Sequence, residues 1–186
     1  MDFITILLLA IGLSFDSFAV SISSGVAKTQ IRFMAATRIA FSLAFFQAFL
    51  PLLGWLIGKQ FTKYVESTDH WIAFTLLSLL GLKMIYESFK KDGQKTSFNP
   101  LDTLTLLGMS LATSIDAFIV GISFGFLQIN IWLCLIVIGA VTFFISMLGI
   151  LFGKRTGEWL GKWAEIAGGL ILIGIGTKIL IQHLYF

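Results

Sequence analysis

Two short segments of this chain are near-copies, and each places an aspartate inside an otherwise uncharged apolar stretch. Leu13–Gly25 reads LSFDSFAVSISSG, and Thr113–Gly125 reads TSIDAFIVGISFG. Their aspartates, Asp16 and Asp116, are 100 residues apart (116 − 16). A carboxylate at bilayer depth costs roughly 2.5–3.5 kcal/mol on insertion scales. Two of them at matching positions indicate a duplicated unit whose halves together hold something cationic.

The composition places these segments in a membrane. Only 12% of the residues are charged and 57% are hydrophobic, whereas a soluble domain carries about a quarter charged residues. A transmembrane helix needs about 20 apolar residues, so 186 residues leave room for about six spans and short loops. We therefore predict an all-α polytopic membrane protein with a single transmembrane domain over residues 1–186.

Polar and charged segments divide the chain into six predicted helices. Breaks are expected at Lys28–Arg32, Lys59–Asp69, Lys90–Pro100, Gln128–Asn130 and Lys154–Lys162. The helices between them are predicted over residues 3–25, 37–58, 70–89, 102–125, 130–152 and 163–184.

The duplication extends beyond the aspartates. Gly54 and Gly81 recur 95 residues later as Gly149 and Gly176, and Lys83 recurs as Lys178. The chain is thus predicted to be repeat one (about 1–90), a loop (about 90–100) and repeat two (about 101–186). Three helices per repeat are an odd number of crossings, so the second copy enters the membrane inverted, with a pseudo-twofold axis in the membrane plane.

Basic residues predict the orientation. The loops between helices one and two, three and four, and five and six carry most of the Lys and Arg, whereas the opposite side holds Lys59 and Lys63. Positively charged loops stay in the cytoplasm. Both termini are therefore expected to face outward.

The aspartates have small or hydroxyl-bearing neighbours. Residues three, four and seven apart share a helix face, which places Ser23 beside Asp16 and both Thr113 and Ser123 beside Asp116. Such neighbours leave space and oxygen donors for a cation, and equivalent mid-span residues of an inverted repeat approach each other near the midplane. The supporting residues are predicted to be Ser14, Ser23, Gly25, Thr113, Ser114, Ser123 and Gly125. The alternative is that each aspartate only hydrogen-bonds a neighbouring helix.

Two further polar residues are candidate ligands. Gln47 lies in an apolar run and could give an amide oxygen to a metal or hydrogen-bond an aspartate. Glu165 begins the sixth predicted helix, where it could be a carboxylate at the cytoplasmic entrance or an acid favoured by the helix dipole. Carboxylates, hydroxyls and an amide suit hard divalent cations such as Mg²⁺, Ca²⁺ and Mn²⁺, whereas zinc and copper sites use Cys and His clusters.

The motifs resemble those of the MntP family of bacterial manganese efflux pumps. The resemblance rests on GLSFDSFAVS (12–21) and ATSIDAFIVG (112–121), with PLLGW (51–55), HWIAF (70–74) and AEIAGGLILIGIG (164–176). It implies six transmembrane helices in the inner membrane and export of Mn²⁺ from the cytoplasm. The family's functional residues carry over to Asp16, Asp116, Gly25 and Glu165. Some members have a glutamate where this chain has Gln47.

Energetics constrain the mechanism. Moving a dication outward against about 100 mV costs roughly 4.6 kcal/mol, and the chain has no phosphate-binding glycine loop for ATP. We therefore expect secondary transport in which Asp16 and Asp116 bind either Mn²⁺ or protons. No catalytic motif is present, so we expect a transporter rather than an enzyme, with lipid and Mn²⁺ as partners, no resident cofactor and no nucleic acid. The sequence sets no oligomeric state.

Three alternatives stay open at this stage. The same architecture could export another divalent cation, or a small solute such as an amino acid, as LysE-type exporters do. An amino acid would require a cation for its carboxylate, and the sequence shows none in mid-span. A membrane protein that transports nothing would tolerate neutralisation of both aspartates.

Overall fold

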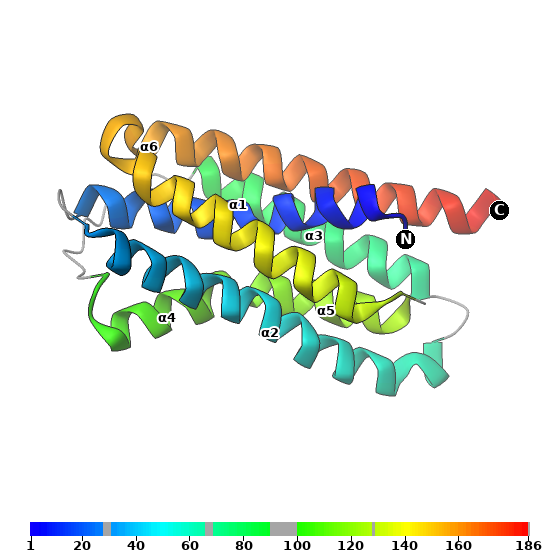
Figure 1. Ribbon diagram of the computed structural model, residues 1–186. Helices are drawn as coiled ribbons and strands as arrows, with labels where there is room; N and C mark the ends of the chain where they lie inside the picture. Colours follow the sequence, from blue (N-terminus) through cyan, green and yellow to red (C-terminus); the bar gives the residue numbers. More distant parts are fainter. Residues whose placement is uncertain (28–30, 66–68, 90–99, 128, 186) are drawn as a thin grey trace.

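The computed structural model describes residues 1–27, 31–65, 69–89, 100–127 and 129–185. Helices form nearly all of these ranges and lie along one elongated bundle, with both chain ends at the same end of it (Figure 1). This confirms the all-α prediction for the described residues. The helices are α1 (Phe3–Ala27), α2 (Phe33–Val65), α3 (Asp69–Phe89), α4 (Thr103–Thr113), α5 (Ile115–Phe126) and α6 (Ile131–Tyr185).

The α6 helix consists of two arms, and the first arm (Ile131–Phe152) runs parallel to α1. The hydroxyls of Ser14 and Thr142 are 2.9 Å apart, and further along both helices Gly149 packs against Ser21. Residue numbers therefore rise in the same direction on the two helices.

The second arm of α6, which contains the apolar stretch Ile166–Ile181, runs in the opposite direction along α1. Ile171 lies against Gly12, whereas Lys178 binds Asp2 at the beginning of the chain. The chain must therefore reverse direction within α6, and Figure 1 shows the turn between its yellow and orange sections. The break predicted over 154–162 is thus a reversal through which the backbone keeps its helical turns.

The structure corrects two of the predicted helices. The helix predicted over residues 102–125 is divided at Ser114 into α4 and α5, with a bend of 40° between them. The helix predicted over 37–58 extends at both ends, from Phe33 to Val65. The predicted loop segments at 28–30, 66–68 and 90–99 lie outside the described residues.

Length and composition identify membrane-spanning candidates among the described residues. Three helical segments are long and apolar enough to cross a membrane: Phe3–Gly25, Phe33–Gln60 and Ile131–Phe152. The bent pair α4 and α5 passes the same test when counted together. Shorter apolar stretches lie in α3 (Phe74–Lys83) and in the second arm of α6 (Ile166–Ile181). Large apolar side chains also cover the bundle's surface, including Phe33, Met34, Leu104 and Ile136, as expected for helices that contact lipid.

Glycines bring several helices into backbone contact at equivalent positions of the repeat. A Cβ added to Gly54 on α2 would collide with the carbonyl of Phe118 on α5, and one added to Gly149 on α6 would lie 3.0 Å from the carbonyl of Phe18 on α1. These are equivalent pairs, because each residue lies 95 or 100 residues from its counterpart. Small residues permit such close helix packing in membranes.

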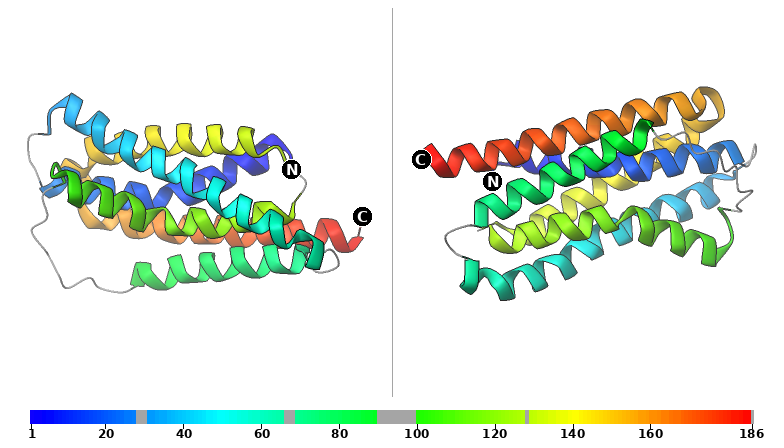
Figure 2. Two further views of the ribbon diagram at one scale, coloured as in Figure 1. Left: turned by 90° about the horizontal axis from the view of Figure 1, so that it is seen from below. Right: turned by 180° about the vertical axis from the view of Figure 1, so that it is seen from behind.

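The α3 helix packs along the second arm of α6 in the same manner. An added Cβ at Gly81 would meet the carbonyl of Gly169, and one at Gly176 would lie 3.4 Å from the carbonyl of Phe74. Gly176 lies 95 residues after Gly81, and Gly169 lies 95 after Phe74, so these contacts also form an equivalent pair. The right-hand view of Figure 2 shows the two helices side by side.

Candidate functional site

The side-chain amide of Gln47 connects the two aspartate motifs. Gln47 is fully buried on α2. Its Nε2 donates to the carbonyl of Leu13 at 2.9 Å, and its Oε1 accepts from the hydroxyl of Ser114 at 3.0 Å. Leu13 precedes Asp16 on α1, and Ser114 precedes Asp116, so one polar group holds both motifs in the centre of the bundle.

The second motif lies at a helix break. Ser114 ends α4 and precedes α5, and its backbone N–H bonds to the carbonyl of Leu111 instead of the carbonyl four residues earlier. The Ser114 side chain is occupied by Gln47 and does not cap α5. Asp116 therefore stands in the first turn of α5, where the free N–H groups and the helix dipole favour a negative charge.

Asp116 is buried and paired with a cation. Its side chain is 6% exposed, and its Oδ1 accepts a hydrogen bond of 2.8 Å from Lys83 Nζ on α3. The Lys83 side chain remains 46% exposed. Charge-assisted hydrogen bonds of this kind are stronger than neutral ones, so the ammonium compensates much of the cost of burying the carboxylate.

Asp16 has a different setting. It is half-buried in the middle of α1, which continues as a helix through the motif. Figure 1 shows α1 running away from the N-terminal end of the bundle and α5 running toward it. Asp16 lies three residues beyond Leu13, and Asp116 two residues beyond Ser114, so the antiparallel directions place the backbone positions of the two aspartates on opposite sides of the Gln47 bridge along the bundle axis.

The predicted hydroxyl residues mostly bond to their own helices. Ser14 donates to the carbonyl of Ala10 at 2.6 Å, Thr113 to that of Met109 at 3.0 Å, and Ser123 to that of Ile119 at 3.4 Å.

The remaining predicted residues have varied positions. Ser23 is exposed and donates to the carbonyl of Ala19 at 3.1 Å. Gly25 and Gly125 are buried, and a Cβ added to Gly125 would lie 2.6 Å from Gly58 on α2. Glu165 belongs to α6, and its side chain lies outside the described part of the structure.

Two carboxylates outside the apolar spans are held in the ionised form. Hydrogen bonds from Lys178 and from the Thr5 hydroxyl lower the pKa of Asp2 to about 2. The backbone N–H and hydroxyl of Thr105 lower the pKa of Asp102, which caps α4. Both acids thus fix the ends of helices.

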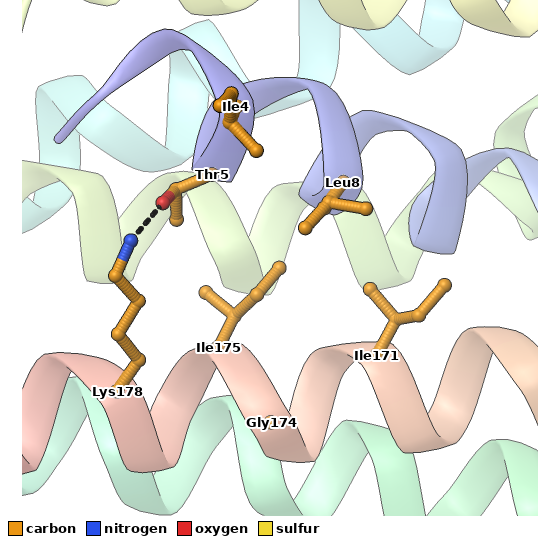
Figure 3. A pocket seen from close by; sticks show the side chains of 7 residues that line it. All are labelled: Ile4, Thr5, Leu8, Ile171, Gly174, Ile175 and Lys178. Atoms are coloured by element: carbon orange, nitrogen blue, oxygen red, sulfur yellow. Dashed lines mark hydrogen bonds between the residues drawn. The ribbon is translucent and has the colours of Figure 1, made fainter.

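Lys178 also lines a groove between α1 and α6. Figure 3 shows its ammonium bonded to Thr5 beside apolar side chains that include Leu8 and Ile175. The groove has a volume of about 270 Å³, and a second hollow of about 230 Å³ lies on α3 around Trp71. Neither of the two is lined by Asp16 or Asp116.

Apart from the Lys83 ammonium, the side chains described around the motifs offer oxygen atoms as metal ligands. Among the described residues no three His, Cys, Asp or Glu side chains gather closely enough to hold a metal together. A cation bound here would therefore combine carboxylate oxygen with amide, hydroxyl or carbonyl oxygens, which suits a hard ion that keeps part of its hydration.

Sequence reasoning missed two polar residues near the motifs. Lys83 was noted only as a repeated position, whereas its ammonium binds Asp116. Thr142 was not considered, yet it lies 95 residues after Gln47 and contacts Ser14 as Gln47 contacts Ser114. The offset of 95 residues was the signal that could have identified Thr142, whereas Lys178, the counterpart of Lys83, binds Asp2 instead of an aspartate motif.

Comparisons with known proteins agree on one family. Residues 30–180 match the family described as "Putative manganese efflux pump". The chain is 50% identical over 187 residues to the "Putative manganese efflux pump MntP" of Parabacteroides distasonis, with all of both chains covered. It is 46% identical over 184 residues to the protein of that name from Crocosphaera subtropica, covering 99% of this chain and 98% of the relative. No solved structure matches the chain.

Proposed function

Because this chain belongs to the family of putative manganese efflux pumps, we propose that it exports Mn²⁺ across the cytoplasmic membrane by proton-coupled secondary transport. The observation that carries this proposal is the buried carboxylate of Asp116, which lies at a helix break beside the polar bridge of Gln47. Ionisable groups inside membrane spans mark ion pathways. Broken helices in transporters expose backbone groups that bind ions near the bilayer midplane.

The proposed architecture is six crossings arranged as two inverted repeats in one domain. The apolar parts of α1, α2, α3, the bent pair α4–α5, and the two arms of α6 supply the crossings. The paired glycine contacts support the repeat, since Gly54 meets Phe118 as Gly149 meets Phe18. The positions of the basic residues support an orientation with both termini outside the inner membrane.

In the proposed cycle, Asp116 and Asp16 are the charged ligands of Mn²⁺. Gln47 contributes its amide oxygen, and Glu165 is the carboxylate through which the ion enters from the cytoplasm. Hydroxyls such as Ser14 and Ser114 complete the oxygen shell or hold water that does so. Since Asp16 and Asp116 lie on opposite sides of the Gln47 bridge, the ion passes from one carboxylate to the other across the bridge.

Proton coupling follows from the charge balance. Two carboxylates that release a dication into the outer solution remain negative inside the membrane, at a cost of several kcal/mol. Protons entering from outside would neutralise them for the return step, and the inward proton gradient would provide the roughly 4.6 kcal/mol needed against 100 mV.

Inside-out membrane vesicles test the proposal directly. Vesicles that contain the chain should accumulate ⁵⁴Mn²⁺ when their lumen is acidified, and a protonophore should abolish the accumulation. Vesicles with the Asp116→Asn variant at equal abundance are the matched control. Absence of Mn²⁺ uptake by the unaltered chain would overturn the efflux function. Uptake at the same rate with and without the proton gradient would overturn only the proton coupling. Competition by Mg²⁺, Ca²⁺ and Zn²⁺ in the same assay measures selectivity.

A further inference from the structure

The ion pair between Lys83 and Asp116 places a cation of the protein itself on the proposed metal ligand. Lys83 Nζ is 2.8 Å from Asp116 Oδ1, inside the range of a charge-assisted hydrogen bond. Only 6% of the Asp116 side chain is exposed. An oxygen atom engaged by an ammonium at this distance binds a metal more weakly, because the two cations repel each other.

We propose that Lys83 is the counter-cation of the metal-free transporter: its ammonium occupies Asp116 when the site is empty, and Mn²⁺ displaces it. This inference rests on the proposed function and adds a residue to its mechanism. The displaced ammonium lowers the net affinity for the ion and returns to the carboxylate as the ion leaves. Lys83 thus neutralises Asp116 as the dication leaves, so the proton of the proposed cycle is required at Asp16.

The geometry around Lys83 fits a side chain that moves on a fixed backbone. Two residues before it, Gly81 contacts the backbone of Gly169 on α6, so an added Cβ there would collide with the Gly169 carbonyl. The α3 backbone is therefore held tightly against α6. The Lys83 side chain is nearly half exposed, and its four-carbon stem allows the ammonium to leave Asp116 while the helix stays in place.

The repeat provides a matched reference. Lys178 lies 95 residues after Lys83, but its ammonium binds Asp2 at 3.0 Å and the hydroxyl of Thr5. Asp2 is 58% exposed and is not a proposed ligand. A substitution at Lys178 thus removes an equivalent charge without touching a metal ligand.

Mn²⁺ binding to the purified full-length chain tests the inference. Lys83→Met should bind Mn²⁺ about tenfold more tightly, since an adjacent opposite charge stabilises a carboxylate by at least that factor and the metal no longer displaces it. The same variant should release the ion more slowly and show reduced efflux in proteoliposomes. Lys178→Met should match the unaltered chain in both measurements. Unchanged or weaker Mn²⁺ binding by folded Lys83→Met would overturn the inference.

A labelling measurement on the unaltered chain does not depend on any variant folding. Mn²⁺ should increase the acylation of Lys83 by an amine-reactive ester, measured by mass spectrometry, and leave that of Lys178 unchanged. Equal labelling of Lys83 with and without Mn²⁺, at concentrations that saturate transport, would contradict displacement. Failure of the unaltered chain to bind or transport Mn²⁺ would instead overturn the proposed function, so the two failures are distinguishable.

Discussion

The two halves of the chain make equivalent central contacts but build different seams around them. Ser14 shares a hydrogen bond of 2.9 Å with Thr142 on α6, and Ser114 donates one of 3.0 Å to Gln47 on α2. We call the first the α1–α6 seam and the second the α2–α5 seam. Their members correspond in the repeat: Ser14, Ser17, Ser21, Thr142 and Ser146 in the first, and Ser114, Ala117, Gly121, Gln47 and Pro51 in the second.

Hydroxyl groups without partners line the α1–α6 seam. Ser17, Ser21 and Ser146 are fully buried, and their hydroxyls have no hydrogen-bond partner within the described ranges. Helix periodicity places Ser17 on the same face as Ser14 and Ser21. A buried hydroxyl left unpaired costs about 1–3 kcal/mol, so this seam holds polar groups that would gain from contact with water or a cation.

Backbone contact closes the α2–α5 seam. An added Cβ at Gly121 would lie 2.5 Å from the Cα of Pro51, and one at Gly58 would collide with the carbonyl of Ile122. Ala117, which replaces Ser17 of the other half, is fully buried. A repeat with one tightly closed seam and one polar seam whose hydroxyls lack partners predicts that α1 and the first arm of α6 separate at a lower free-energy cost than α2 and α5.

The largest expected effect comes from neutralising either aspartate. Asp116→Asn and Asp16→Asn should each abolish Mn²⁺ efflux, because both carboxylates are proposed ligands. Manganese tolerance of cells and the amount of chain in the membrane are the measurements. Asp102→Asn is a matched control, since its carboxylate caps α4 outside the proposed site. Full tolerance in either motif variant would remove that aspartate from the ligand set.

A methyl group at the closed seam should have the next largest effect. Gly121→Ala forces α2 and α5 apart and should lower the free energy of unfolding by about 1–3 kcal/mol, as overpacking does. Gly108→Ala on α4 is the control: nothing lies within 4 Å of its added Cβ, so it should gain up to about 1 kcal/mol from helix propensity. Denaturation in detergent micelles measures both, and equal midpoints would disprove backbone closure of this seam.

Single hydroxyls should distinguish the seams more finely. Ser114→Ala leaves Gln47 Oε1 without its donor and should cost about 1–3 kcal/mol of unfolding free energy. Ser17→Ala removes a buried hydroxyl that has no described partner and should raise the free energy of unfolding by up to about 1–3 kcal/mol, because the cost of burying that hydroxyl disappears. If Ser17→Ala destabilises as strongly as Ser114→Ala, the α1–α6 seam is satisfied by groups such as bound water.

Apolar runs and the polar segments between them were sufficient to predict most of the helical architecture. The hairpin at Gln128–Asn130 was predicted from one short polar segment, and Asn130 indeed caps α6 by accepting a hydrogen bond from the Leu133 N–H at 3.3 Å. These features are local, because each helix buries its backbone groups within its own segment.

Features that depend on contacts between distant residues could not be predicted. Ser14 and Ser114 occupy matching places in the motifs, yet α1 continues through Ser14 while α4 ends before Ser114. The difference coincides with the Ser114 hydroxyl bonding to Gln47 rather than to its own helix, a contact across 67 residues. Lys83 and Asp116 are likewise brought together only by the packing of α3 against α5.

The smallest effect is expected from breaking the exposed ion pair between Asp2 and Lys178. This change tests the contrast between Lys83 and Lys178. The bond to Lys178 lowers the pKa of Asp2 to about 2 from its ordinary 3.8. A lowered folded-state pKa stabilises the pair above the unfolded value, and this contribution is lost as the pH falls from about 4 toward 2. Asp2→Asn should remove that pH dependence and speed hydrogen exchange in the first turn of α1, with efflux at neutral pH unchanged. Loss of efflux comparable to that of Lys83→Met would show that the outer ion pair also takes part in transport, and the two equivalent lysines would then act as a symmetric pair.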